Sequence, residues 1–178
     1  MNKDVEKILA DFRESIQAEL EAGMSESDLK EKVLALILLL FALGSGYETS
    51  EYISGEDREW LDEMYKMTVA STAGIIARAS SGADMEATAI KLSNHAKGAY
   101  SYSIIVNGGE DEEMMKWELG ETEHCGDCFA YAAMGAQPRS YWTMIATERN
   151  HYPQSPHLEC KGLHCQCNMV GDDGDQEN

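Results

Sequence analysis

Five cysteines in the last third of the chain are the residues best suited to chemistry: Cys125, Cys128, Cys160, Cys165 and Cys167. They follow the pattern C-x2-C, then 31 intervening residues, then C-x4-C-x-C. Zinc prefers four soft ligands in a tetrahedron, and a C-x2-C turn directs two thiolates to the same side. In an extended segment residues two apart share a side, so Cys165 and Cys167 can face one ion. The pattern predicts a structural zinc site.

The ligand set remains open at this level, because five thiols exceed the four positions of a tetrahedral site. We expect Cys125 and Cys128 to be ligands, with the second pair drawn from the three later cysteines. His124 and His164 each adjoin a cysteine and are the alternative ligands, although such a histidine is more often a surface or hydrogen-bonding residue. Disulfides, an iron–sulfur cluster and free thiols are the other interpretations. A reducing cytosol disfavours disulfides, and nothing else indicates the electron transfer that a cluster would serve.

No catalytic pattern accompanies the cysteines. A zinc deaminase requires H-x-E and then P-C-x-x-C, whereas Glu123 and His124 precede Cys125, with no proline before it. The motifs G-x-S-x-G, P-loop and G-x-G-x-x-G do not occur. Paired carboxylates are uninformative in so acidic a chain. We therefore expect a protein without enzymatic activity.

Charge and hydropathy exclude other classes of function. The chain has 178 residues, enough for one domain, and a formal net charge of -18 from 14 Lys+Arg against 32 Asp+Glu. Such a surface repels phosphate and anionic lipid, which disfavours nucleic-acid readout and membrane binding. The longest apolar run, Val33 to Leu43, holds 11 residues and predicts a buried helix segment, because a membrane span needs about 20. Without a signal-peptide pattern, we expect a soluble, intracellular protein.

The part of the chain before the cysteines is predicted to be mainly helical. Apolar residues at spacings of three and four predict four helices before residue 107. Ser25 with Asp28 and Ser54 with Asp57 form expected N-terminal caps, and Gly23 is an expected helix end. The predicted helices cover residues 3–22, about 25–43, about 54–80 and about 85–106.

The composition changes at residues 107–113, where two glycines are followed by four acids. We place a boundary there. A helical domain (1–107) precedes a Cys-rich metal-binding module (114–170) and an acidic disordered tail (171–178). The predicted fold class is mainly α, a bundle of about four helices followed by a small α+β zinc-knuckle module. So small a module is marginal by apolar burial alone, and a structural zinc would add on the order of 10 kcal/mol.

Two stretches of the module carry a resemblance. Glu123–Cys128 follows Trp117, and Leu158–Cys167 comes later, with Trp142 and Pro153 between them. This order resembles the C-terminal part of tailed-bacteriophage minor head proteins, the head-morphogenesis proteins of the phage Mu type and their shorter relatives. The match covers about residues 115 to 170. Full minor head proteins have a longer N-terminal region, and some carry toxin or ADP-ribosyltransferase extensions that this chain lacks.

The resemblance implies a non-enzymatic virion protein of a tailed dsDNA phage, assembled in the host cytoplasm. It would sit at the head or neck, as a minor head protein or head–tail connector docked on portal, capsid or tail-neck proteins. A connector would form a homo-oligomeric ring. From the charge we infer that a lumen lined by carboxylates would let DNA pass with little adhesion.

Two other functions compete with the virion role. One is a zinc-stabilised adaptor outside the virion that binds a protein or single-stranded nucleic acid. The scarcity of cations, only Arg139, Arg149 and Lys161 after Trp117, argues against the nucleic-acid form. The other is an enzyme that uses the zinc, and four protein ligands on the ion would argue against it.

Overall fold

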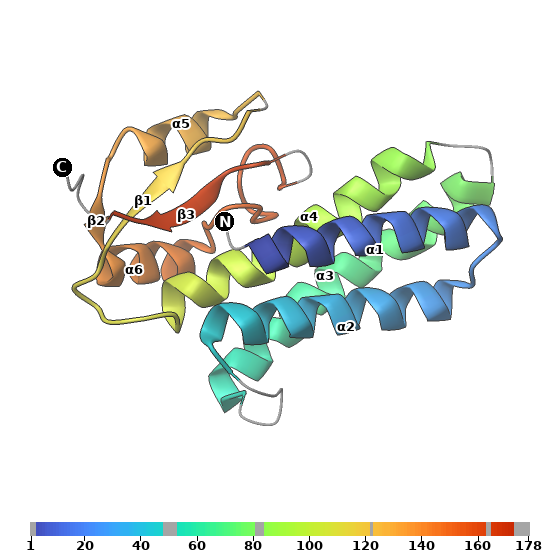
Figure 1. Cartoon of the computed structure of the whole chain (residues 1–178), viewed down its shortest axis with the longest axis horizontal. Helices are drawn as coiled ribbons and strands as arrows, with labels where there is room; N and C mark the ends of the chain where they lie inside the picture. The colour runs from blue at the N-terminus through green and yellow to red at the C-terminus, as the bar shows by residue number, and fades with distance from the viewer. Residues whose placement is uncertain (1–2, 48–52, 81–83, 122, 163–164, 173–178) are drawn as a thin grey trace.

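Four long helices form an elongated bundle in the computed structural model (Figure 1). The structure describes residues 3–47, 53–80, 84–121, 123–162 and 165–172. The helices are α1 (Lys3–Glu21), α2 (Glu26–Ser45), α3 (Gly55–Ser80) and α4 (Met85–Val106). None of the helices in these ranges is long and apolar enough to cross a membrane.

Local capping sets the ends of these helices, as predicted. The Ser25 hydroxyl accepts the Asp28 backbone N–H at the start of α2, and the Ser54 hydroxyl accepts the Asp57 N–H, 3.1 Å away in each case. Each cap satisfies one donor that has no partner inside the helix. Gly46 ends α2 with a φ of 70°, in the left-handed region that glycine enters without a Cβ penalty. The four helices therefore begin and end within a few residues of the expected positions.

Helix α2 and helix α4 pack closely in the centre of the bundle. A Cβ atom added to Gly44 would lie only 2.9 Å from the Tyr100 carbonyl oxygen, so this crossing requires glycine. The apolar run is a core helix segment, with Ile37 and Leu40 fully buried. Its burial is incomplete, however, because Leu39 is 46% exposed on the outer side.

The C-terminal region is a small sheet with two helices. It contains β1 (Met114–Glu118), α5 (Gly126–Ala132), β2 (Gln137–Pro138), α6 (Arg139–Arg149) and β3 (Asn168–Gly171). The strand order is β2-β1-β3, and both pairings are antiparallel. Figure 1 shows this sheet at one end of the bundle, with α5 and α6 beside it. The predicted fold class, mainly α with a small α+β module, is confirmed.

The two regions share one buried core. The Tyr102 ring of α4 stacks on Trp60 of α3 at a centroid distance of 3.9 Å. Tyr152, from the C-terminal region, lies edge-on to Tyr102 at 5.4 Å and to Trp60 at 5.8 Å. Gly98 leaves room for this contact, since a Cβ there would lie 3.4 Å from the Tyr152 ring. Whether residues 1–107 and 114–170 fold separately stays a prediction.

The start of the predicted tail belongs to the sheet. Gly171 is the last residue of β3, and the Asp172 N–H donates to the Met114 carbonyl at 2.7 Å. The Asp172 carboxylate also pairs with Lys116 at 3.0 Å. Gly171 and Asp172 therefore belong to the sheet region, and the rest of the predicted tail, residues 173–178, lies outside the described ranges.

Candidate metal centre

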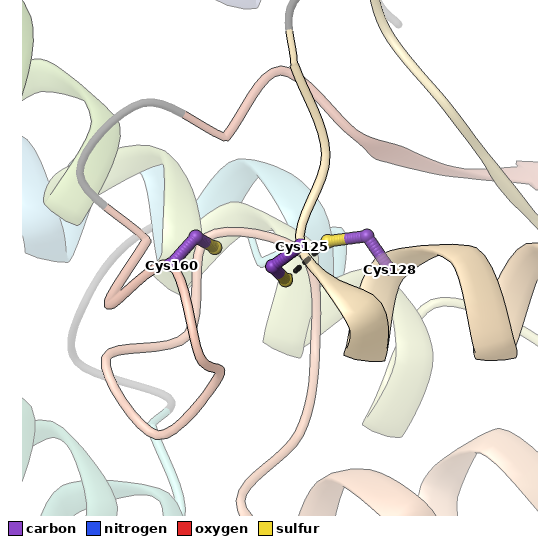
Figure 2. Close-up of side chains that lie close together, drawn as sticks. All are labelled: Cys125, Cys128 and Cys160. Atoms are coloured by element: carbon purple, nitrogen blue, oxygen red, sulfur yellow. Dashed lines mark hydrogen bonds between the residues drawn. The ribbon is translucent and has the colours of Figure 1, made fainter.

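All five cysteines meet in one cluster of free thiols. The sulfur atoms of Cys125, Cys128 and Cys160 lie within 4.8 Å of one another, and those of Cys128, Cys165 and Cys167 do the same. Figure 2 shows the first three, with Cys125 and Cys128 at the start of α5 and Cys160 on a separate loop. The Cys125 and Cys128 sulfurs are 3.5 Å apart. The cluster could therefore hold a metal ion, as the spacing predicted.

Reciprocal hydrogen bonds fasten the Cys160 loop to the start of α5. The Gly126 N–H donates to a Glu159 carboxylate oxygen, and the Glu159 N–H donates to an Asp127 carboxylate oxygen, both at 2.8 Å. Gly126 sits in the first turn of α5 without the positive φ that a tight turn would need. It provides space instead, because a Cβ there would lie 2.9 Å from the Glu159 carboxylate. These contacts bring Cys160 to Cys125.

Gln154 positions the other pair of cysteines. Its fully buried side chain donates from Nε2 to the carbonyl oxygens of Cys165 and Cys167, at 3.3 and 2.5 Å. Its Oε1 accepts the Ser101 hydroxyl of α4 at 2.8 Å. The backbone that carries these two thiols is thus attached to the bundle. No sequence motif marked Gln154, and its position between Pro153 and Pro156 was the only local signal.

One sulfur in each group of three favours the thiolate. Burial opposes ionisation of Cys125, but the backbone N–H groups of Cys128 and Cys160 hydrogen-bond its sulfur and lower its pKa. Hydrogen bonds from the Cys128 and Cys165 thiols, with smaller contributions from Trp117 and Gly120, lower the pKa of Cys167 to about 3. Conversely, donation to Cys165 and Cys167 raises the pKa of the Cys128 thiol. Stabilised thiolates are the form that binds metals.

Two buried groups of the surrounding structure suit a negatively charged metal–thiolate centre. The Trp117 indole Nε1 is buried without a well-formed hydrogen bond and lies near the Cys167 sulfur. Lys97 of α4 is only 5% exposed. Burial lowers the pKa of Lys97, and the charges of Cys165 and Cys167 oppose that shift. A buried donor and a buried cation are costly unless a negative group compensates them, so the residues around the thiols fit a bound metal.

Of the two histidines that adjoin a cysteine, His124 lies within the described residues and contacts the cluster. His124 Nε2 lies 2.9 Å from the Gly120 carbonyl oxygen, and Nδ1 lies 3.5 Å from the Cys167 sulfur. Because a carbonyl only accepts, Nε2 carries a proton, and Nδ1 is the nitrogen that faces the Cys167 sulfur. His164 lies outside the described residues.

The aromatic residues of the motif form the core behind the thiols. Trp117 of β1 and Trp142 of α6 are 3% and 1% exposed, with ring centroids 6.2 Å apart. Tyr131 of α5 stacks on Trp117 at 5.0 Å. The Trp142 indole donates to the Met115 carbonyl at 2.8 Å, which joins α6 to β1. The motif residues therefore surround one site although they are spread over 50 positions of the sequence.

Comparisons with models of protein families, with curated proteins and with solved structures find no match to this chain. The resemblance to phage minor head proteins therefore rests on the residue pattern alone and stays a prediction.

Proposed function

We propose that this chain is a non-enzymatic structural or assembly protein of a tailed-phage virion, stabilised by a structural zinc centre. It acts at the head or neck as a minor head protein or head–tail connector. Its partners are portal, capsid or tail-neck proteins, and further copies of itself in a ring. DNA passes nearby without specific readout.

The thiol cluster is the observation that carries the structural role. Five cysteines from α5, the Cys160 loop and the segment before β3 converge there. Soft thiolates in such a group select zinc among the available divalent ions by ligand type and geometry. Cys128, Cys165 and Cys167 are at most 4% exposed, which leaves little access for a reacting substrate. This arrangement favours a structural ion over a catalytic one.

Support for the virion role comes from the two motif segments and the charge. Glu123–Cys128 and Leu158–Cys167 supply all five thiols of the cluster, so the residues behind the resemblance serve a common structural purpose. The net charge of -18 suits a surface that DNA passes without adhering.

Mass spectrometry of particles purified from the phage that carries the gene tests the virion role. We expect the chain at low copy number in intact, nuclease-treated virions, and not only in the lysate. Its absence from particles, with the protein present in the lysate, would contradict the proposal.

Zinc analysis of the full-length protein tests the ion separately. The matched variants are Cys128→Ser, whose side chain is central to the cluster, and Ser140→Ala, an exposed position of the same region. We expect zinc in the wild type and in Ser140→Ala, and loss of zinc in Cys128→Ser. A wild-type protein without zinc would contradict the structural role of the metal.

A further inference from the structure

The sulfur positions do not match a single tetrahedral ion. With Zn–S bonds near 2.3 Å, sulfurs on one tetrahedral zinc lie about 3.8 Å apart, so four ligands would all be mutual neighbours. Within the described chain the thiols instead form two groups of three, and Cys128 belongs to both. We propose that the cluster binds two zinc ions bridged by the Cys128 thiolate. This inference rests on the proposed zinc binding and extends it.

The first ion lies among Cys125, Cys128 and Cys160. Asp127 and Glu159 each bring a carboxylate oxygen within 4.8 Å of the Cys125 sulfur, but among the described residues neither forms such a group with Cys128 or Cys160. Each carboxylate uses one oxygen, Oδ2 or Oε2, to accept a backbone N–H, which holds it beside Cys125. The three thiolates therefore define the first site.

The second ion lies among Cys128, Cys165 and Cys167, whose sulfurs are mutual neighbours. His124 Nδ1 lies 3.5 Å from the Cys167 sulfur, but among the described residues it forms no such group with Cys128 or Cys165. The Nε2–H bond to the Gly120 carbonyl holds the ring beside Cys167. The three thiolates therefore define the second site.

The position of Cys128 suits a bridging ligand. It sits in the first turn of α5, between the two other groups of sulfurs, and is 1% exposed. Its sulfur is 3.5 Å from that of Cys125, and its thiol also donates to Cys165 and Cys167. A single sulfur thus already faces both sites, and a thiolate has enough lone pairs to bind two ions.

Native mass spectrometry of the full-length protein, purified with zinc and without chelator, tests the stoichiometry. We expect two zinc ions per wild-type chain. Cys160→Ser should lose the first ion and keep the second, whereas Cys167→Ser should lose the second and keep the first. Cys128→Ser should lose both. One ion in the wild type would overturn the two-ion centre and leave the proposed structural zinc intact, whereas no ion would overturn both.

A second measurement avoids dependence on variants that fail to fold. The wild-type protein loaded with cadmium-113 should give two NMR signals, both coupled to the Cys128 β protons. A single signal, or coupling of Cys128 to only one of two signals, would overturn the bridge.

Discussion

The helical bundle and the Cys-rich region bury their interiors with different residues. The bundle core consists mainly of aliphatic side chains on long helices, such as Leu9, Ile37 and Leu40. The Cys-rich region buries thiols and aromatic rings, and its longest regular element is α6, with 11 residues. Burial of a large aliphatic side chain stabilises a fold by about 1.5–3 kcal/mol, so the bundle has its own source of stability.

The Cys-rich region needs a different source, because short elements bury little apolar area. Its five thiols lie where an aliphatic core would otherwise be. Because their interiors consist of different residues, the two regions should respond to different perturbations although they share one core. The bundle should be sensitive to packing, and the Cys-rich region to the metal.

Removal of the metal should have the largest effect. A structural zinc contributes on the order of 10 kcal/mol to a small module, comparable to the whole stability of a domain. A strong chelator should therefore abolish the near-UV circular dichroism of buried Trp117 and Trp142, while most of the far-UV helix signal remains. Titration with zinc should restore the near-UV signal. An unchanged near-UV spectrum in protein shown to be zinc-free would remove the contrast between the regions.

Arg139 connects the two regions, and its loss should be the next largest effect. The guanidinium is 3% exposed, donates to the Ile104 and Ile105 carbonyls at the end of α4, and pairs with Glu113 at 2.6 Å. Arg139→Gln leaves these acceptors without a cation, which should cost roughly 3 kcal/mol. Urea denaturation measures this loss in the free energy of unfolding.

The matched control is Arg149→Gln, in the last turn of the same helix and exposed. It should change the free energy of unfolding by less than about 1 kcal/mol. If both variants lose the same stability, the Arg139 contacts do not couple the regions.

Two glycines of the bundle should respond in opposite directions. In Gly44→Ala the new methyl group overlaps the Ser103 hydroxyl and approaches the Tyr100 carbonyl, and such overpacking costs about 1–3 kcal/mol. Around Gly74 of α3 nothing lies within 4 Å of an added Cβ, so Gly74→Ala should stabilise the helix by roughly 0.5–1 kcal/mol. Thermal unfolding should show both shifts, with the zinc content unchanged. A loss of zinc in Gly44→Ala would show that bundle packing also controls the metal site.

Lys97→Met should have the smallest effect on stability, and it tests whether charge links the two regions. Removal of this buried ammonium relieves its desolvation and should stabilise the metal-free protein slightly. It also removes a positive charge near Cys165 and Cys167, so zinc affinity should fall about tenfold, or roughly 1.4 kcal/mol. Competition with a chromophoric chelator measures the affinity. An unchanged zinc affinity would mean that the Lys97 ammonium does not stabilise the negative charge of the metal–thiolate centre.

The helix boundaries could be predicted because their causes are local. Ser25 and Asp28 lie within one turn of each other, and the cap they form depends on no distant residue. The same holds for Gly46 and for the apolar spacing of α1. Which side chains of a helix are buried was harder to predict. A continuous apolar run does not show that Leu39 is exposed.

The candidate site was predictable only in its residue types. Soft thiols at C-x2-C and C-x-C spacing already indicated a metal. Gln154 and Lys97 had no such signal, because only the fold brings their side chains to the segment that carries Cys165 and Cys167. Gly126, inside the C-x2-C motif, gives space to the Glu159 carboxylate and has no positive φ, a role that the spacing of the motif does not reveal.

The sequence by itself determined four helices, their caps and a set of thiols fit for a metal, since short-range geometry and ligand chemistry are properties of neighbouring residues. Only the tertiary structure decided how those thiols are grouped. The position of Cys128 between two groups depends on α5, the Cys160 loop and the segment held by Gln154. Distances between such segments are set by packing and hydrogen bonds across more than 30 residues of chain, which no local pattern encodes.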